Sequence, residues 1–74
     1  MKYFEIEFTD GRTPDECICI RGLREPSIEE AAEFCAEDAK IIGMPVNNVY
    51  PIDEQTARSC YDFRNVDNWP VFGA

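Results

Sequence analysis

Hydrophobic and polar residues alternate along two stretches near the start of the chain, and this pattern predicts two half-buried β-strands. The first stretch covers residues 2–9 (KYFEIEFT) and the second covers residues 15–21 (DECICIR). Residues 9–14 (TDGRTP) lie between them and contain the turn-forming pair Asp10-Gly11. We therefore expect the two strands to form a hairpin.

The register of this hairpin decides which way the cysteines point. A two-residue turn at Asp10-Gly11 would place Glu5 opposite Glu16, a like-charge pair that is destabilising. A longer loop or a bulge, which shifts the pairing by one, instead gathers four apolar side chains on one face: Phe4, Ile6, Ile18 and Ile20. We favour the second register, which puts Cys17 and Cys19 on the outer face.

Residues 27–43 (SIEEAAEFCAEDAKIIG) predict a 15-residue helix with signals at both ends. Ser27 and Glu30 have the spacing of a capping box, while Gly43 and Pro45 are typical of a helix end. Six residues, four of them small, fall on one stripe of this helix and are expected to face the sheet: Ile28, Ala31, Ala32, Cys35, Ala39 and Ile42.

The second half of the chain contains shorter elements. Residues 46–52 (VNNVYPI) predict a strand, and Pro51 favours a place at the edge of the sheet. Asp53 can cap a second helix over 54–61 with Ala57, Cys60 and Tyr61 facing inward. Alternation over 57–63 leaves a strand as an alternative.

The apolar C-terminal tail completes the predicted domain. Trp69, Val71 and Phe72 are expected to pack against the rest of the chain as an irregular edge segment. The whole pattern predicts one α+β domain over residues 1–74, a two-layer ββαβ(α) arrangement in which the main helix crosses one face of a small antiparallel sheet.

Charge and length limit the classes of function. Fifteen acidic residues against seven basic ones give a net charge of −8, which argues against direct binding to nucleic acid or anionic membranes. We find neither a signal peptide nor an apolar run of the roughly 20 residues that a membrane span requires. We therefore expect a cytoplasmic protein with reduced cysteines.

Catalytic and metal-binding signals are weak. The chain has no histidine and no phosphate-binding or nucleophile motif, so we expect neither an enzyme nor a cofactor, although a carboxylate pair remains an alternative. Cys17 and Cys19 lack the spacing of a zinc knuckle, and Cys35 and Cys60 stand alone. We favour cysteines that pack as small apolar residues over a shared metal or redox site.

The arrangement of negative charge is the main functional signal. Four glutamates, 29, 30, 33 and 37, lie along about 12 Å of the predicted helix, close to the charge density of a nucleic-acid strand. Glu5 and Glu7 add two more negative charges on the outer face of the first predicted strand. The candidate partner-binding face is therefore Glu29, Glu30, Glu33, Glu37, Glu5 and Glu7. The alternative is an ordinary solvated surface that keeps the protein soluble.

Apolar residues outside the main stripe give a second candidate contact. Phe34, Ile41 and Trp69 could form a protein-binding patch or the seam of a homodimer. The alternative is a wider hydrophobic core.

These observations favour a non-catalytic protein-binding module, and specifically an inhibitor or nucleic-acid mimic that blocks a basic, nucleic-acid-handling partner. In size and charge alone, the chain is similar to small counter-defence proteins of phages and mobile elements, such as anti-CRISPR proteins. The alternatives are a structural or regulatory domain, with a homodimer as one form, and a thiolate metal or redox protein.

Overall fold

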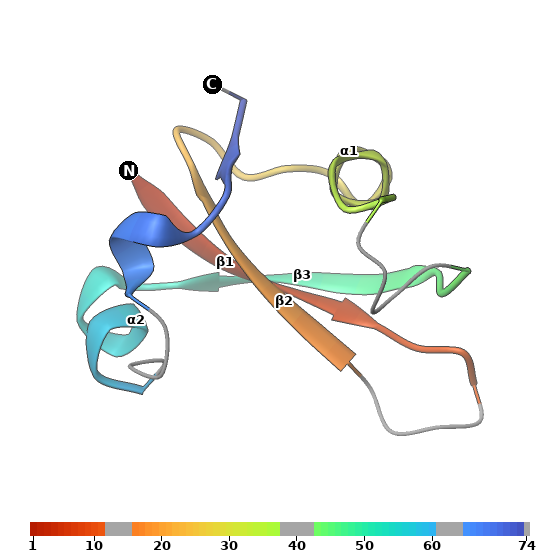
Figure 1. Ribbon diagram of the computed structural model, residues 1–74, viewed down its shortest axis with the longest axis horizontal. Helices are drawn as coiled ribbons and strands as arrows, with labels where there is room; N and C mark the ends of the chain where they lie inside the picture. The colour runs from red at the N-terminus through yellow and green to blue at the C-terminus, as the bar shows by residue number, and fades with distance from the viewer. Residues whose placement is uncertain (12–15, 38–42, 61–64, 74) are drawn as a thin grey trace.

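A computed structural model describes residues 1–11, 16–37, 43–60 and 65–73 of the chain. Along these residues the elements are β1 (Lys2–Phe8), β2 (Glu16–Gly22), α1 (Ile28–Phe34), β3 (Val46–Ile52), α2 (Glu54–Cys60), a 3₁₀ turn η1 (Val66–Asn68) and β4 (Val71–Phe72). Figure 1 shows a twisted sheet with α1 on one side and α2 on the other. The predicted α+β class is confirmed.

The sheet has the strand order β3-β1-β2-β4, with β1 and β2 as its central pair. Phe4 lies opposite Ile20 and Ile6 lies opposite Ile18, so the large apolar side chains of the hairpin share one face as predicted. This register differs from that of a two-residue turn by three residues rather than one. Glu5 thereby faces Cys19 and not Glu16, which avoids the like-charge pair.

β3 is an edge strand, as Pro51 indicated, and it pairs antiparallel with β1. A register shift between Glu7 and Phe8 leaves Asn47 between the partners of those two residues. Farther along, the Val49 amide donates to Asn48 Oδ1 at 2.8 Å, and Pro51 has no amide to donate. At these two positions the edge therefore offers no amide to a further strand.

The C-terminal tail forms a regular strand where an irregular edge segment was expected. β4 pairs parallel with β2, so the sheet is mixed rather than wholly antiparallel. Gly22 permits this approach, because a Cβ at that position would lie 2.7 Å from the Phe72 carbonyl oxygen. Arg21 also holds the tail: its Nε donates to the Trp69 carbonyl at 3.0 Å and its Nη2 to the Asp67 carbonyl at 2.6 Å.

Two hydrophobic clusters lie on opposite faces of the sheet. The inner cluster, beneath α1, consists of Phe4, Ile6, Phe8, Ile18, Ile20, Ala31, Cys35 and Phe72. The outer cluster, beneath α2 and η1, consists of Tyr3, Cys19, Ala57, Val66 and Trp69. Strand alternation explains this division, because Tyr3 and Phe4 are neighbours that point to opposite faces. The outer face is therefore covered at one end, where Cys19 is buried.

The start of α1 is confirmed in detail, whereas its predicted length of 15 residues is not shown. The Glu30 amide donates to Ser27 Oγ at 3.1 Å and the Ser27 amide donates to Glu30 Oε1 at 3.0 Å, which completes the capping box. The helix ends at Phe34, followed by a turn over residues 35–37. The last turn of α1 has no basic residue, so Glu33 opposes the helix dipole there.

The shorter helix buries a narrower stripe than expected. Seven residues make fewer than two turns, and among the described members of the predicted stripe only Ala31 and Cys35 are buried. Ile28 is 49% exposed and Ala32 is also exposed, so both were placed wrongly in the core. Ala39 and Ile42 lie outside the described residues.

The second helix is confirmed, and the strand alternative over 57–63 is wrong where it overlaps α2. Asp53 Oδ1 accepts the Thr56 amide at 2.7 Å, and this hydrogen bond holds the pKa of Asp53 below its usual range. Ala57 is fully buried against the outer face, as predicted. The side chain of Cys60 and residue Tyr61, also expected to face inward, lie outside the described part of the chain.

We predict that Gly22→Ala destabilises the domain by about 1–3 kcal/mol, because the added methyl group collides with the β4 backbone. Urea unfolding followed by Trp69 fluorescence measures this change, since Trp69 is only 1% exposed in the folded state. Leu23→Ala is the matched control at a side chain that is 70% exposed. Equal stability of the two variants would contradict the close approach of β4 to β2.

Candidate functional site

Three of the predicted glutamates form an exposed acidic group on α1 and the turn that follows it. Glu29, Glu33 and Glu37 are all exposed. Glu29 and Glu33 are one helical turn apart and so project from the same side of α1. Within the described ranges, no lysine or arginine forms an ion pair with these three carboxylates. This group, Glu29, Glu33 and Glu37, is called the α1 acidic group below.

Glu30 differs from its neighbours because an arginine neutralises it. Arg24 Nη1 and Nη2 donate to Oε1 and Oε2 of Glu30 at 2.9 and 2.5 Å, a bidentate pair. The hydrogen bond from Arg24, together with that from the Ser27 amide, lowers the pKa of Glu30 to about 2. Sequence reasoning missed this pair, although a capping box directs Glu30 back toward the loop that carries Arg24.

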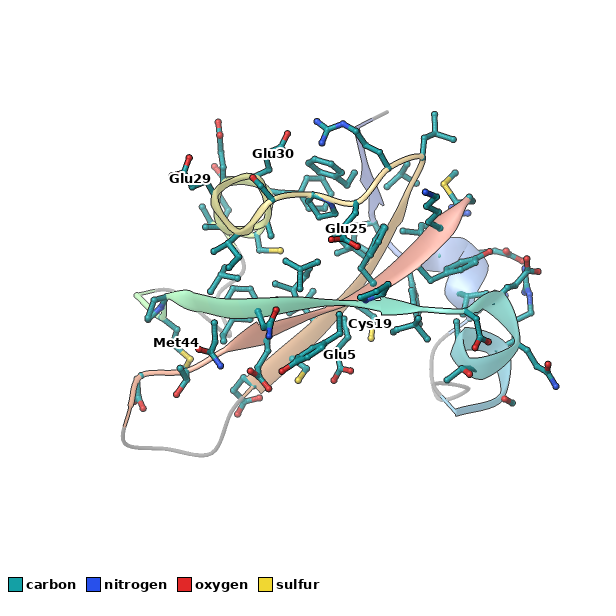
Figure 2. All side chains as sticks on the ribbon, turned by 180° about the vertical axis from the view of Figure 1, so that it is seen from behind. Glu5, Cys19, Glu25, Glu29, Glu30 and Met44 are labelled. Carbon is teal, nitrogen blue, oxygen red and sulfur yellow. The ribbon has the colours of Figure 1, made fainter. Side chains whose placement is uncertain are left out.

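The structure does not bring Glu5 and Glu7 together with the helix glutamates. Both belong to the outer face of β1, opposite the face that α1 covers. In Figure 2, Glu5 and Cys19 lie on one side of the sheet, and Glu29 and Glu30 lie on the other. The predicted face of six carboxylates is therefore wrong as one continuous surface: strand alternation separates it into two.

The outer-face carboxylates have polar neighbours of their own. Asn47 Nδ2 donates to Glu7 Oε1 at 2.5 Å, and the Tyr50 hydroxyl is 3.5 Å from the same oxygen. Partial burial and a hydrogen bond to Glu5, with the negative charge of Glu7 nearby, raise the pKa of the Cys17 thiol to about 12. Cys17 thus stays protonated at neutral pH, which disfavours thiolate chemistry there.

The three apolar candidates have different outcomes. Trp69 is 1% exposed and packs edge-to-face against Tyr3 with ring centroids 5.9 Å apart. Its expected packing against the domain is confirmed, and a place in a surface patch is wrong. Phe34 is 38% exposed at the end of α1 and contacts Phe72. Ile41 lies outside the described residues.

Phe34 and Phe72 line a small concave site beside the α1 acidic group. This site, called the aromatic notch below, has a volume of about 250 Å³ and is lined by Glu30, Glu33, Phe34 and Phe72. The two rings meet edge-to-face with centroids 5.6 Å apart. Arg24 lies over the Phe72 ring, its guanidinium carbon 4.9 Å from the centroid. Carboxylates beside aromatic rings are a combination that attracts cations.

A larger groove lies where the start of β1 meets the end of β3. It has a volume of about 400 Å³, and Phe4, Pro51 and Ile52 contribute apolar parts of its wall. Its lining contains three acidic residues, Glu25, Asp53 and Glu54. Lys2 contributes a positive charge, and Met1 lies beside it. Asp53 caps α2 and Glu54 pairs with Arg58 at 3.0 Å, so this groove has less uncommitted negative charge than the α1 side.

The described residues contain neither a cluster of potential metal ligands nor a helix that could span a membrane. No three side chains of His, Cys, Asp or Glu in this part of the chain are placed to hold a metal ion. Cys19 and Cys35 lie in different clusters on opposite faces of the sheet. The helices described here are too short to cross a membrane.

Comparison with known proteins adds no further assignment: the sequence matches no protein family, no curated protein and no solved structure.

We predict that Cys17 reacts with iodoacetamide at pH 8 about tenfold or more slowly than cysteine in an unstructured peptide, because little of its thiol is ionised. Glu5→Gln should lower the pKa of the thiol and accelerate the reaction. Peptide mapping by mass spectrometry measures alkylation at Cys17 alone, and Glu54→Gln on α2 is the control. A wild-type rate equal to that of the free peptide would contradict this electrostatic account.

The Arg24–Glu30 pair predicts a pH-dependent contribution to stability. Because folding lowers the pKa of Glu30 from 4.5 to about 2, the contribution is present above pH 4.5 and is lost as the pH falls through 2. Wild type should therefore be more stable than Glu30→Gln at pH 7, and the difference should shrink toward pH 2. Glutamine keeps the capping geometry, so this variant isolates the charge.

Urea unfolding at a series of pH values measures this difference in the free energy of unfolding. Arg24→Gln should reproduce the pH dependence of Glu30→Gln, and the double variant should add little to either single change. A difference between wild type and Glu30→Gln that stays constant from pH 7 to pH 2 would exclude the ion pair as its source.

Proposed function

We propose that this chain is a non-catalytic protein-binding module that inhibits a basic, nucleic-acid-handling partner. The observation that carries the proposal is the α1 acidic group: three exposed carboxylates that no described cation neutralises, on a protein with a net charge of −8. A surface of this sign attracts a basic surface and speeds its encounter. Counter-defence proteins of phages and mobile elements, anti-CRISPR proteins among them, are the analogy in size and charge.

The spacing of the carboxylates defines the kind of inhibition. With Glu30 neutralised, Glu29 and Glu33 are about 6 Å apart along the helix axis. A nucleic-acid strand has one charge per roughly 3.4 Å, so the helix carries a sparser charge than the strand. The proposal is therefore nucleic-acid mimicry by competition for the same basic surface, without a replica of phosphate spacing.

Exposed apolar side chains on α1 support a protein as the class of binding partner. Ile28 is 49% exposed and Phe34 is 38% exposed, and both border the acidic positions. Apolar residues surrounded by charge are typical of protein interfaces, where apolar contacts supply affinity and charges supply selectivity. A cytoplasmic location and a homodimer stay predictions.

Two charge-reversed variants test this proposal. Glu29→Lys/Glu33→Lys changes the α1 acidic group, and Glu5→Lys/Glu7→Lys makes the same change in net charge on the opposite face of the sheet. Each immobilised variant is incubated with cell lysate, and captured proteins are identified by mass spectrometry. Duplex DNA and increasing salt are then used as competing eluents, and circular dichroism verifies that both variants fold.

We expect wild type and the Glu5/Glu7 variant to capture a nucleic-acid-binding protein that duplex DNA displaces. The Glu29/Glu33 variant should lose most of this capture, because its helix now repels the basic surface. Equal capture by both variants would show that α1 is not the binding face. A captured protein that neither DNA nor salt displaces would overturn mimicry.

A further inference from the structure

The aromatic notch has the shape and chemistry of a receptor for one flat cation. Both aromatic rings line it: Phe72 is 7% exposed and Phe34 is 38% exposed. Glu30 and Glu33 complete the lining. Its volume of about 250 Å³ suits a single side chain rather than a larger ligand.

The chain's own Arg24 shows which cation fits these groups. Its guanidinium lies over the Phe72 ring, with 4.9 Å between its central carbon and the ring centroid, and two of its nitrogens donate hydrogen bonds to Glu30. This arrangement combines a cation–π contact with a bidentate ion pair, which a planar guanidinium makes better than an ammonium. Arginine thus already contacts one side of the lining of the notch, Glu30 and Phe72.

The other side offers the same two groups without such an occupant among the described residues. Phe34 presents an exposed ring, and Glu33 is an exposed carboxylate on the preceding position of α1. We propose that this side of the notch binds an arginine side chain of the partner protein, stacked on Phe34 and paired with Glu33. The proposal rests on the proposed function and names the residue of the basic partner that α1 recognises.

A short peptide tests the notch without knowledge of the partner. The probe is acetyl-Gly-Arg-Gly-amide, and the same peptide with citrulline keeps the shape but removes the charge. NMR titration follows the amides of the described residues and the ring signals of Phe34 and Phe72. We expect saturable shifts confined to the notch with the arginine peptide, much smaller shifts with citrulline, and weaker binding with lysine.

Three variants separate the notch from bulk charge. Glu33→Gln and Phe34→Leu should each weaken the arginine peptide about two- to fivefold or more, the range of an exposed cation–π or ion-pair contact. Glu54→Gln removes one negative charge from α2, outside the notch, and should leave binding unchanged. Circular dichroism and unfolding curves verify the fold of Phe34→Leu, and Glu33→Gln tests the same site without a change in packing.

Equal shifts with citrulline, equal binding of lysine, or equal losses from Glu33→Gln and Glu54→Gln would each overturn the arginine site. Such a result would not affect the proposed function if capture from lysate still depended on Glu29 and Glu33. Conversely, arginine binding at the notch without capture of a nucleic-acid-binding protein would support this inference and overturn the proposed function.

Discussion

The pairing of β1 with β2 is the constraint on which the rest of the structure depends. Phe4 opposite Ile20 and Ile6 opposite Ile18 place the largest aliphatic and aromatic groups of the hairpin under α1. Because side chains alternate along a strand, a slip of one residue would turn Glu5 and Glu7 into this core. The register therefore determines which side chains form the core beneath α1. It also places Glu5 and Glu7 on the face away from α1.

A domain of 74 residues would have only a small hydrophobic core if it buried side chains on one face of its sheet. The cluster on the outer face adds to that core. Tyr3 and Cys19 emerge on that face, and Trp69 covers them from the C-terminal tail. Arg21 makes this possible, since its hydrogen bonds to the Trp69 and Asp67 carbonyls hold a segment that is 46–48 residues distant in the chain. The opposite end of the same face stays open, with Glu7, Cys17 and Asn47 on it.

Local signals predicted the local structure, and contacts between distant segments account for most of the errors. Alternation was sufficient for β1, β2 and the face of Phe4, and the Ser27–Glu30 spacing was sufficient for the start of α1. No local sequence signal indicated that β4 would pack closely against Gly22, or that α2 would lie on the face opposite α1. Both features depend on tertiary contacts. For the site, residue types were predicted, but their grouping into one surface required the fold.

Arg24 shows why a count of charges could not identify the binding surface. One arginine removes Glu30 from the acidic face, and its pairing with that residue places a guanidinium over Phe72. The same contact thus neutralises one carboxylate of α1 and places a cation against Glu30 and Phe72, two of the residues that line the aromatic notch. As a result, the two glutamates on this side of α1 differ: Glu29 does not line the notch, whereas Glu33 lies beside an aromatic ring. The aromatic ring beside Glu33 favours selectivity for a particular basic side chain there, because charge alone attracts every cation equally.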